Sequence, residues 1–238
     1  MIVLLTDFSQ SEYVGIMKGV IARISPKSQI IDLSHQIKTV KQGAWVLLQS
    51  YKSFPENTVF LCVVDPGVGS GRKPIIVKTK DYTFIGPDNG LLWKATSENL
   101  ISDIREILSN KAISSTFHGR DVFAPCAARL DSGEKTESKT IKDIVKLDFK
   151  LDDRTGEIVH IDSFGNIITN LPHIGAESYF VSSGKFNEHL LFHKTYAEAK
   201  ENELFLIEGS SKTLELSIKG KDASKVTKLN LGAEIDIR

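Results

Sequence analysis

The sequence predicts an α/β fold: a mostly parallel sheet flanked by helices, followed by a smaller, β-barrel-like domain. Its 238 residues suffice for one large domain or two small ones. In the first part of the chain, short apolar runs alternate with segments whose apolar residues recur every three or four positions, as strands and helices do. After about residue 150 the helical spacing gives way to short strand patterns. We therefore expect an α/β domain over residues 1–150 and a β-rich domain over 151–238.

The first domain begins in the order strand, helix, strand, helix, strand. Residues 2–5 form a continuous apolar run, typical of a strand covered on both faces. A helix is expected from Tyr13 to Ile24, where Ser25-Pro26 ends it. Such an alternation favours right-handed crossovers and a largely parallel sheet. The next strand, helix and strand are expected at residues 29–33, 44–51 and 59–64.

The later elements are predicted from shorter patterns. Residues 75–77 and 82–85 suggest a hairpin, and residues 122–130 a helix with Asp121 as its N-cap. The polar stretch 131–143 is the best candidate for a linker. Strands of the second domain, a sandwich or barrel, are expected at residues 158–161, 167–170, 190–192, 204–207, 214–218 and 235–237.

Composition excludes several classes of protein. The 41% apolar content argues against disorder, and 30 basic against 30 acidic residues leave no net charge to attract nucleic acid or a membrane surface. The two cysteines lie in apolar stretches without metal-ligand spacing, so we expect buried free thiols and no metal site. No apolar run reaches the ~20 residues that span a bilayer, and the N-terminus reads as a strand rather than a signal peptide. We therefore expect a cytoplasmic protein.

A glycine-rich loop, Asp65-Pro66-Gly67-Val68-Gly69-Ser70-Gly71-Arg72, follows the strand at residues 59–64. Functional residues in open α/β sheets tend to lie beyond the carboxyl ends of the strands, where this loop falls. Its spacing matches neither common phosphate-binding pattern, and no helix start follows it. Two interpretations remain open: a functional loop, or a turn whose Asp65 and Arg72 pair at the surface.

Three further polar stretches lie at element boundaries in the first domain. Asp7 follows the first strand; its carboxylate either suits a ligand diol or caps the helix that begins near Glu12. Asp88 and Asn89 lie in a Pro-Asp-Asn-Gly stretch, which is typical of a turn. His118 precedes a helix and is either a general base or a hydrogen-bonded core histidine.

In the second domain, Asp162-Ser163-Phe164-Gly165-Asn166 separates two predicted strands. The stretch is either a tight hairpin turn or a clamp for a planar ligand, in which Phe164 stacks on the ligand and the Asn166 amide reads its edge. Ser210 is an ordinary turn residue unless it lines the same cleft.

Taken in order, these motifs resemble the S-adenosylmethionine hydrolase (SAM hydroxide adenosyltransferase) family, relatives of the fluorinase and chlorinase. The resemblance runs nearly end to end, although Ser9, Glu12, residues 38–41 and Lys219-Gly220-Lys221 depart from the family pattern. The matching stretches are Thr6-Asp7-Phe8, Tyr13-Val14-Gly15, residues 64–69 with Arg72, residues 87–92, residues 117–125, and residues 162–166 with Thr169-Asn170.

The resemblance implies a role for each candidate residue. Asp65, Arg72 and His118 would form the catalytic trio of the hydrolases, which the halogenating relatives lack. Phe8, Asp88 and Asn89 are also expected to bind substrate. Among the remaining residues, Asp7 would hold the ribose hydroxyls, Phe164 would stack on adenine, Asn166 and the backbone near Gly220 would read its edge, and Asp162 and Ser210 would hold the methionine moiety.

The implied reaction is attack of water or hydroxide on C5′ of S-adenosylmethionine, giving adenosine and L-methionine. S-adenosylmethionine is the substrate, and no metal or further cofactor is implied. The family likeness also implies a homotrimer with the site at a subunit interface. The alternatives are a non-catalytic protein that binds adenosine or S-adenosylmethionine, and a halogenase; Asp65 argues against the halogenase.

Overall fold

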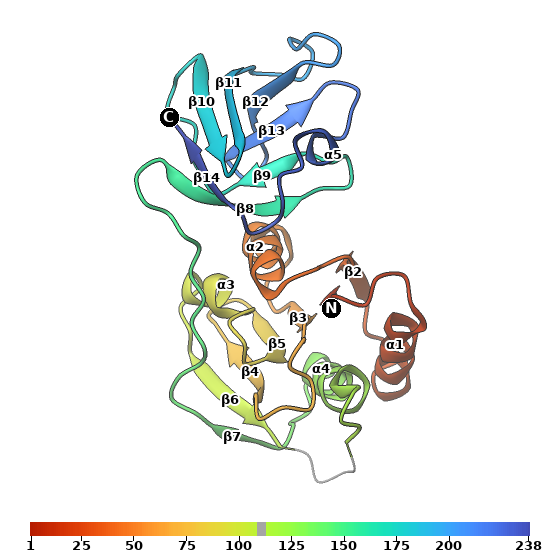
Figure 1. Cartoon of the computed structure of the whole chain (residues 1–238). Coiled ribbons are helices and arrows are strands. Elements are labelled where there is room, and N and C mark those ends of the chain that lie inside the picture. Colours follow the sequence, from red (N-terminus) through yellow and green to blue (C-terminus); the bar gives the residue numbers. More distant parts are fainter. Residues whose placement is uncertain (109–112) are drawn as a thin grey trace. The chain divides into compact units, whose positions relative to one another are not determined.

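The computed structural model describes residues 1–108 and 113–238, which form two compact units (Figure 1). The N-terminal unit comprises Met1–Leu147 and the C-terminal unit Asp148–Arg238. The first contains a mixed sheet with helices and the second a nearly closed antiparallel sheet. The predicted fold class is therefore confirmed.

The N-terminal sheet has the strand order β2-β1-β3-β5-β4-β6-β7. Its parallel part is β2 (Ile30–Ser34), β1 (Ile2–Thr6), β3 (Val59–Val63) and β5 (Thr83–Pro87). The antiparallel part is β4 (Pro74–Lys78), β6 (Asp103–Ile107) and β7 (Ser138–Thr140). The predicted hairpin is the β4–β5 pair, and the first three strands are parallel as expected.

Alternate residues of the central strands face two hydrophobic cores, one on each side of the sheet. Leu4 and Leu61 pack with Met17 of α1 and Ala127 of α4, whereas Val3 and Phe60 belong to the core of α2 and α3. Burial on both faces explains why β1 and β3 are continuous apolar runs. The helices are α1 (Glu12–Ile24), α2 (Val40–Ser50) with the 3₁₀ turn η1 (Tyr51–Ser53), α3 (Trp93–Ser97), the π-helical turn η2 (Gly119–Phe123) and α4 (Ala124–Asp131).

Two local predictions in this unit are wrong. The polar stretch 131–143 is not a linker, because it contains β7, whose residues pair with β6 at the edge of the sheet. An exposed edge strand does not need apolar residues, so its sequence resembles a loop. Asp121 does not cap a helix: it lies inside η2, and its carboxylate accepts hydrogen bonds from the Ser114 backbone N–H and from Arg120.

The C-terminal unit is a seven-stranded antiparallel sheet in the order β11-β10-β14-β8-β9-β13-β12. A bridge between Phe192 and Leu206 connects the end of β11 to β12, so the sheet nearly closes into a barrel. Leu206, Leu214 and Ile235 are among the residues of its main core, and a smaller cluster contains Ala199, Phe205 and Ile207. Its elements are β8 (Thr155–Ile161), β9 (Ile167–Thr169), β10 (Ser178–Ser183), β11 (Phe186–Leu191), β12 (Leu204–Glu208), β13 (Leu214–Ile218), α5 (Ala223–Thr227) and β14 (Glu234–Ile237).

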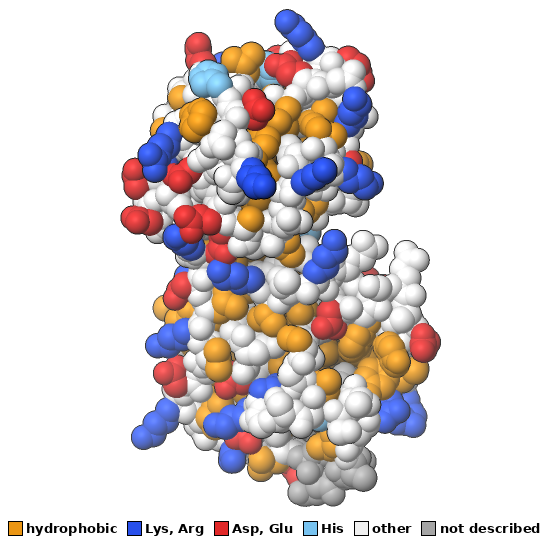
Figure 2. All heavy atoms as spheres, viewed as in Figure 1, with side chains coloured by type: hydrophobic (Ala, Val, Ile, Leu, Met, Phe, Trp, Pro, Cys, Tyr) orange, Lys and Arg blue, Asp and Glu red, His pale blue; other side chains and the backbone are white. Residues whose placement is uncertain are grey.

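The cysteines, the length of the helices and the surface charge were also subjects of prediction. Cys62 and Cys126 are both free and buried, as predicted, and burial raises the pKa of the Cys126 thiol to about 12. Within residues 1–108 and 113–238, no helix has the length and apolarity needed to cross a membrane. On the face seen in Figure 2, acidic and basic side chains are interspersed.

Two glycines allow the packing of the N-terminal unit to be tested. A Cβ on Gly86 would lie 2.4 Å from the Cys62 carbonyl oxygen of the neighbouring strand β3, whereas a Cβ on Gly19 in α1 would meet nothing within 4 Å. We expect Gly86→Ala to lower the free energy of unfolding by about 1–3 kcal/mol through overpacking. Gly19→Ala should raise it by about 0.4–1 kcal/mol, because alanine favours a helix.

Both tryptophans, Trp45 and Trp93, lie in the N-terminal unit, so urea titrations followed by tryptophan fluorescence report on this unit. Equal stability of the Gly86→Ala variant and the wild-type protein would show that the β3–β5 contact is looser than described.

Candidate active site

The carboxyl ends of β1 and β3 bring Asp7 and Asp65 together. The two strands are parallel neighbours, with Thr6 opposite Val63, so the residues that follow them share one edge of the sheet. The Asp65 backbone N–H donates to Asp7 Oδ2 over 3.0 Å. Burial, with a smaller contribution from the Asp65 charge, raises the pKa of Asp7, although backbone hydrogen bonds oppose the rise. Asp7 does not cap α1, which begins at Glu12 after Ser11 at the N-cap position.

The glycine-rich loop places Asp65, Arg72 and His118 in one cluster. Gly69 adopts a φ of 78°, and a Cβ there would lie 2.4 Å from the Ser115 carbonyl oxygen. The glycine therefore lets the loop approach the segment that leads into His118. The Asp65 and Arg72 side chains do pair, but they are only 5% and 8% exposed, so the pair is buried and not at the surface.

Arg72 is the centre of this cluster. Its Nε donates to Asp65 Oδ1 over 2.9 Å, and its Nη2 contacts both Asp65 Oδ2 and His118 Nδ1, the latter over 2.7 Å. Its Nη1 is buried and has no hydrogen-bond partner. Because a guanidinium leaves its N–H groups unpaired only at a cost, this nitrogen is suited to hold an oxygen atom of a water or ligand.

The contact with Arg72 fixes the tautomer of His118. Arginine can only donate, so Nδ1 of the imidazole accepts and the ring proton lies on Nε2. Burial and the positive charge of Arg72 lower the pKa of His118, whereas the charges of Asp65 and Asp121 raise it to a smaller extent. The ring is therefore neutral at pH 7.

The other candidate residues of the N-terminal unit make well-defined contacts. Asn89 Nδ2 donates to the Val64 carbonyl over 2.9 Å, directly before Asp65, and Asp88 Oδ1 accepts from the Val145 backbone N–H over 2.7 Å. The ring of Phe8 packs on those of Tyr13 and Phe117. Ser9, which departs from the family pattern, has a φ of 55°, a left-handed conformation that favours glycine.

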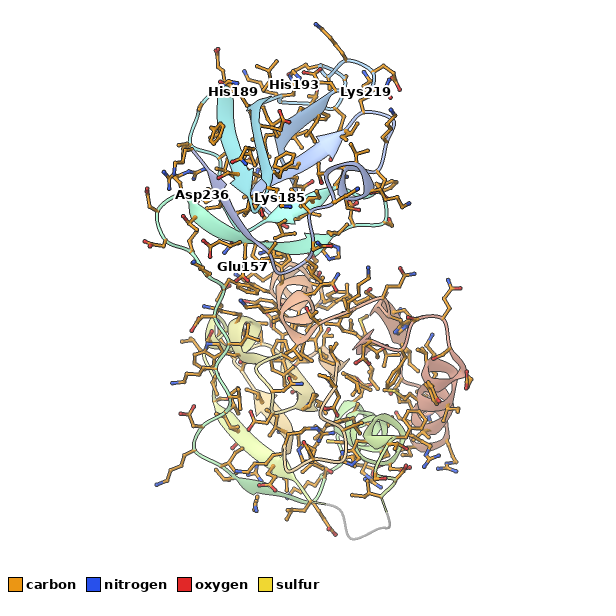
Figure 3. The ribbon with its side chains drawn as sticks, in the orientation of Figure 1. Glu157, Lys185, His189, His193, Lys219 and Asp236 are labelled. Carbon is orange, nitrogen blue, oxygen red and sulfur yellow. The ribbon has the colours of Figure 1, made fainter. Side chains whose placement is uncertain are left out.

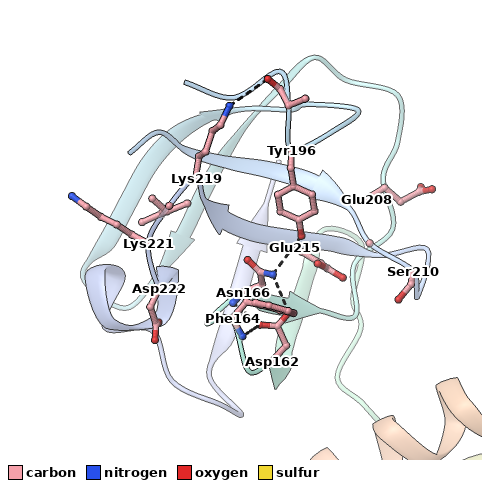
Figure 4. Close-up of a pocket in the computed structure, with 14 residues that line it drawn as sticks. Asp162, Phe164, Asn166, Tyr196, Glu208, Ser210, Glu215, Lys219, Lys221 and Asp222 are labelled. Carbon is pink, nitrogen blue, oxygen red and sulfur yellow. Dashed lines mark hydrogen bonds between the residues drawn. The ribbon is translucent and has the colours of Figure 1, made fainter. Parts of the chain in front are cut away.

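The C-terminal unit contains a cavity of about 1060 Å³ (Figure 4). The five candidate residues of this unit all line it: Asp162, Phe164, Asn166, Ser210 and Gly220. Phe164 is 78% exposed, so its ring is free to stack on a ligand. The volume is sufficient for a drug-sized ligand.

The hairpin turn between β8 and β9 is organised by Asp162. Its Oδ1 accepts from the backbone N–H groups of Phe164 and Asn166, and its Oδ2 accepts from Asn166 Nδ2, each over 2.9 Å. The stretch is thus a tight turn, and the same turn presents Phe164 and Asn166 to the cavity. The two interpretations of this motif are compatible.

Sequence reasoning missed several residues that line the same cavity. Tyr196 places its hydroxyl 3.4 Å from Asn166 Nδ2, and Lys219 Nζ donates to the Ala199 carbonyl over 2.7 Å. Figure 3 labels Lys219 together with His193, whose Nε2 lies 3.1 Å from Glu203 Oε1. The segment 193–203 is anchored by these contacts, and its sequence carries no strand or helix signal. The other residues missed are Ala197, Glu208, Gly209, Glu215, Ile218, Lys221 and Asp222.

The candidate residues thus form two groups. Asp7 and the cluster around Arg72 belong to the N-terminal unit, and the cavity residues to the C-terminal unit. In the part of the chain that the structure describes, no group of three or more His, Cys, Asp or Glu side chains is arranged to hold a metal ion.

An α/β unit with a buried polar cluster at its strand ends is joined to a β-barrel-like unit with a cavity, which defines a two-domain α/β and β-barrel protein. Family models for the SAM hydroxide adenosyltransferase N-terminal and C-terminal domains match residues 2–140 and 156–236. The chain belongs to this family.

Individual relatives agree with this assignment. A protein of Methanocaldococcus jannaschii named (R)-S-adenosyl-L-methionine hydrolase is 38% identical over 99% of this chain and 95% of its own length. The crystal structure of an uncharacterized conserved protein from Thermotoga maritima, at 36% identity, covers both chains completely with a TM-score of 0.92. A fluorinase of Nocardia brasiliensis is more distant, with 26% identity over 70% of this chain and 69% of its own.

The buried ion pair can be tested by a double-mutant cycle. Removing Asp65 leaves the Arg72 charge buried without its partner, so we expect Asp65→Ala to lower the free energy of unfolding by about 3–5 kcal/mol. The double variant Asp65→Ala/Arg72→Met should cost clearly less than the sum of the single variants. Urea titrations followed by tryptophan fluorescence provide the measurement.

The half-exposed pair Asp103–Arg105, with 2.6 Å between Arg105 Nε and Asp103 Oδ2, provides the control. Arg105→Met should cost less than about 1 kcal/mol. Additivity of the Asp65 and Arg72 variants within about 0.5 kcal/mol would contradict the described contact.

Proposed function

We propose that this chain hydrolyses S-adenosylmethionine to adenosine and L-methionine by attack of water or hydroxide on C5′. The observation that carries the proposal is the buried cluster of Asp65, Arg72 and His118, in which Arg72 Nη1 has no partner. Membership of the SAM hydroxide adenosyltransferase family and the hydrolase name of the Methanocaldococcus relative support it.

In this reaction the protein must activate and position the nucleophile rather than assist the leaving group. Methionine leaves the sulfonium as a neutral thioether, so the leaving group needs no general acid. The water must instead be held in line with the C5′–S bond and must lose a proton. Arg72 Nη1 would hold its oxygen, and the positive charge would favour the hydroxide form.

Asp65 and His118 are the proposed pair that holds the water and accepts its proton. Both Asp65 oxygens accept from Arg72, but each keeps a second lone pair for the water. His118 can accept a proton at Nδ1 only when that nitrogen is released from Arg72. The same contacts orient Arg72 toward the reacting oxygen.

Substrate binding is assigned to the remaining candidates. Asp7 would hold the ribose hydroxyls, and Phe8, Asp88 and Asn89 would complete that side of the site. In the C-terminal cavity, Phe164 would stack on adenine, Asn166 and the backbone near Gly220 would read its edge, and Asp162 and Ser210 would bind the methionine moiety. The five candidate residues of the C-terminal unit line one cavity, which supports their part of this assignment. The proposal includes a cytoplasmic homotrimer with its site at a subunit interface.

The source of the new oxygen atom tests the reaction. Incubation of the purified protein with S-adenosylmethionine in ¹⁸O-labelled water should give adenosine that carries one ¹⁸O at the 5′ position, because the nucleophile is solvent. Mass spectrometry of the adenosine is the measurement. Unlabelled adenosine, no adenosine at all, or a 5′-halogenated nucleoside formed in the presence of halide would each overturn the proposal.

The pH dependence of kcat tests the role of His118. Protonation of Nδ1 breaks its contact with Arg72, so kcat should fall as the pH drops through the pKa of His118, which lies below the ordinary 6.5. The rate at saturating S-adenosylmethionine is measured between pH 5 and 8.

His118→Gln should have a low kcat without this acidic limb, whereas His189→Gln, a variant of an exposed histidine in β11, should keep it. An unchanged acidic limb in the His118→Gln variant would show that another group titrates.

A further inference from the structure

Glu215 is a carboxylic acid in the middle of a strand whose other residues are largely apolar. Strand β13 (Leu214–Ile218) runs between β9 and β12, with Glu215 opposite Ile168 and Ile207. Leu214 and Leu216 point into the barrel core, so Glu215 between them points to the opposite face. There it lines the cavity described above.

The surroundings of Glu215 hold its carboxyl group in place. Tyr196, in the segment 193–203, lines the same cavity as Glu215, and its side chain lowers the pKa of the Glu215 carboxyl group. A Cβ on Gly209 would lie 1.6 Å from Glu215 Oε1, so the glycine leaves room for the carboxyl group in its present position. Glu215 is 8% exposed as a result.

No basic side chain among the described residues forms an ion pair with Glu215 or Asp162. Lys219 donates to the carbonyls of Ala197 and Ala199, and Lys221 points away from Glu215 in Figure 4. The remaining acidic side chains of the cavity, by contrast, have partners: Asp222 pairs with Lys225 and Glu208 with Lys212. Two carboxyl groups therefore face the cavity without a cation.

Asp162 alone is poorly placed to satisfy a cationic ligand. Three hydrogen bonds from its own turn already occupy its two oxygens, leaving about one free lone pair. An ammonium group has three N–H donors and needs further acceptors. The carboxyl group of Glu215 is the other acidic group of this cavity that lacks a basic partner.

We infer that Glu215 binds the α-ammonium group of the methionine moiety next to Asp162 and thereby selects ligands that carry the amino acid. This inference rests on the proposed function and deepens it. When the ammonium binds, the carboxylic acid becomes a carboxylate and its proton passes to solvent, while the ligand keeps all three N–H protons.

The titratable groups around Glu215 determine the pH range of this exchange. Burial, and then the charge of Asp162, raise the pKa of Glu215 to about 7, while the nearby Tyr196 side chain lowers it. Below that pH the free protein must release a proton to bind the ammonium; above it the carboxylate is already formed. The affinity for ligands with the amino acid should therefore rise with pH through about 7.

Two stable ligands allow the pH dependence of amino acid binding to be measured separately. S-adenosylhomocysteine and 5′-methylthioadenosine have the same neutral thioether and nucleoside, but only the first carries the amino acid. The ratio of their affinities, measured by calorimetry on the full-length protein between pH 5.5 and 8, cancels every titration that affects both. We expect the ratio to rise about tenfold across this range. Repeating the titration of S-adenosylhomocysteine in buffers of different ionisation enthalpy should show nearly one proton released at pH 5.5 and almost none at pH 8.

Glu215→Gln keeps the size and hydrogen-bonding capacity of the side chain but cannot ionise. At pH 8 this variant should bind S-adenosylhomocysteine about tenfold more weakly than the wild type, with a ratio that no longer depends on pH. Its affinity for 5′-methylthioadenosine, which also reports that the pocket is folded, should be unchanged. The matched control is Glu188→Gln, an exposed carboxylate of β11, which should behave as the wild type.

A wild-type ratio that stays flat with pH, equal affinity of the two ligands, or a Glu215→Gln variant that keeps the rise would each overturn the inference. Release of adenosine from S-adenosylmethionine by the same wild-type preparation is measured separately. If adenosine is released but the affinity ratio does not change with pH, only the role of Glu215 is refuted. If no adenosine is released, the proposed function is refuted.

Discussion

The ion pair between Asp65 and Arg72 is the interaction on which the N-terminal site depends. Both side chains are less than one-tenth exposed, so both charges have lost most of their hydration. Such a loss is offset only by close geometry, and here Arg72 uses two nitrogens on the two oxygens of one carboxylate. As a result, the carboxylate fixes the orientation of the guanidinium, and Arg72 Nη1 has no hydrogen-bond partner.

This fixed guanidinium links the fold to the chemistry. The parallel β1–β3 pair sets the position of Asp65, and the Gly69 contact brings the loop against the segment before His118. Arg72 then lies between a carboxylate and an imidazole. In the proposed reaction, a hydroxide ion held by Arg72 would need little reorganisation of its surroundings, which is the main advantage of a preorganised site. The C-terminal cavity is lined instead by an exposed aromatic ring and by polar groups, which bind the substrate in the proposed function.

The sequence allowed the core strands to be predicted, because their apolar pattern is local, whereas the polar cluster was predicted only through the family resemblance. Buried parallel strands such as β3 are apolar throughout, and the ordered motifs around Asp65 and His118 carry the family resemblance. Strands β6, β7 and β10 were missed because edge or half-exposed strands carry polar residues, as in Asp103–Ile107 and Ser138–Thr140.

The residues around the C-terminal cavity were missed for a different reason. Tyr196 lies in a segment without periodicity, and its position depends on anchoring contacts such as that of Lys219 with Ala199. Glu215 interrupts an apolar strand, which is a visible signal, but only the tertiary structure shows that it faces a cavity with Asp162. Burial of the Asp65–Arg72 pair was likewise not foreseeable from spacing, because it depends on how the loop packs.

In the proposed mechanism, Arg72 presents Nη1 to the oxygen that attacks C5′. A crystal structure of the protein with adenosine and L-methionine bound is the decisive test, because the 5′-hydroxyl of adenosine would be the oxygen that came from water. We expect this oxygen within about 3 Å of Arg72 Nη1. A fully occupied adenosine whose 5′ oxygen points away from Arg72, beyond hydrogen-bonding distance of Asp65 and His118 as well, would contradict the account.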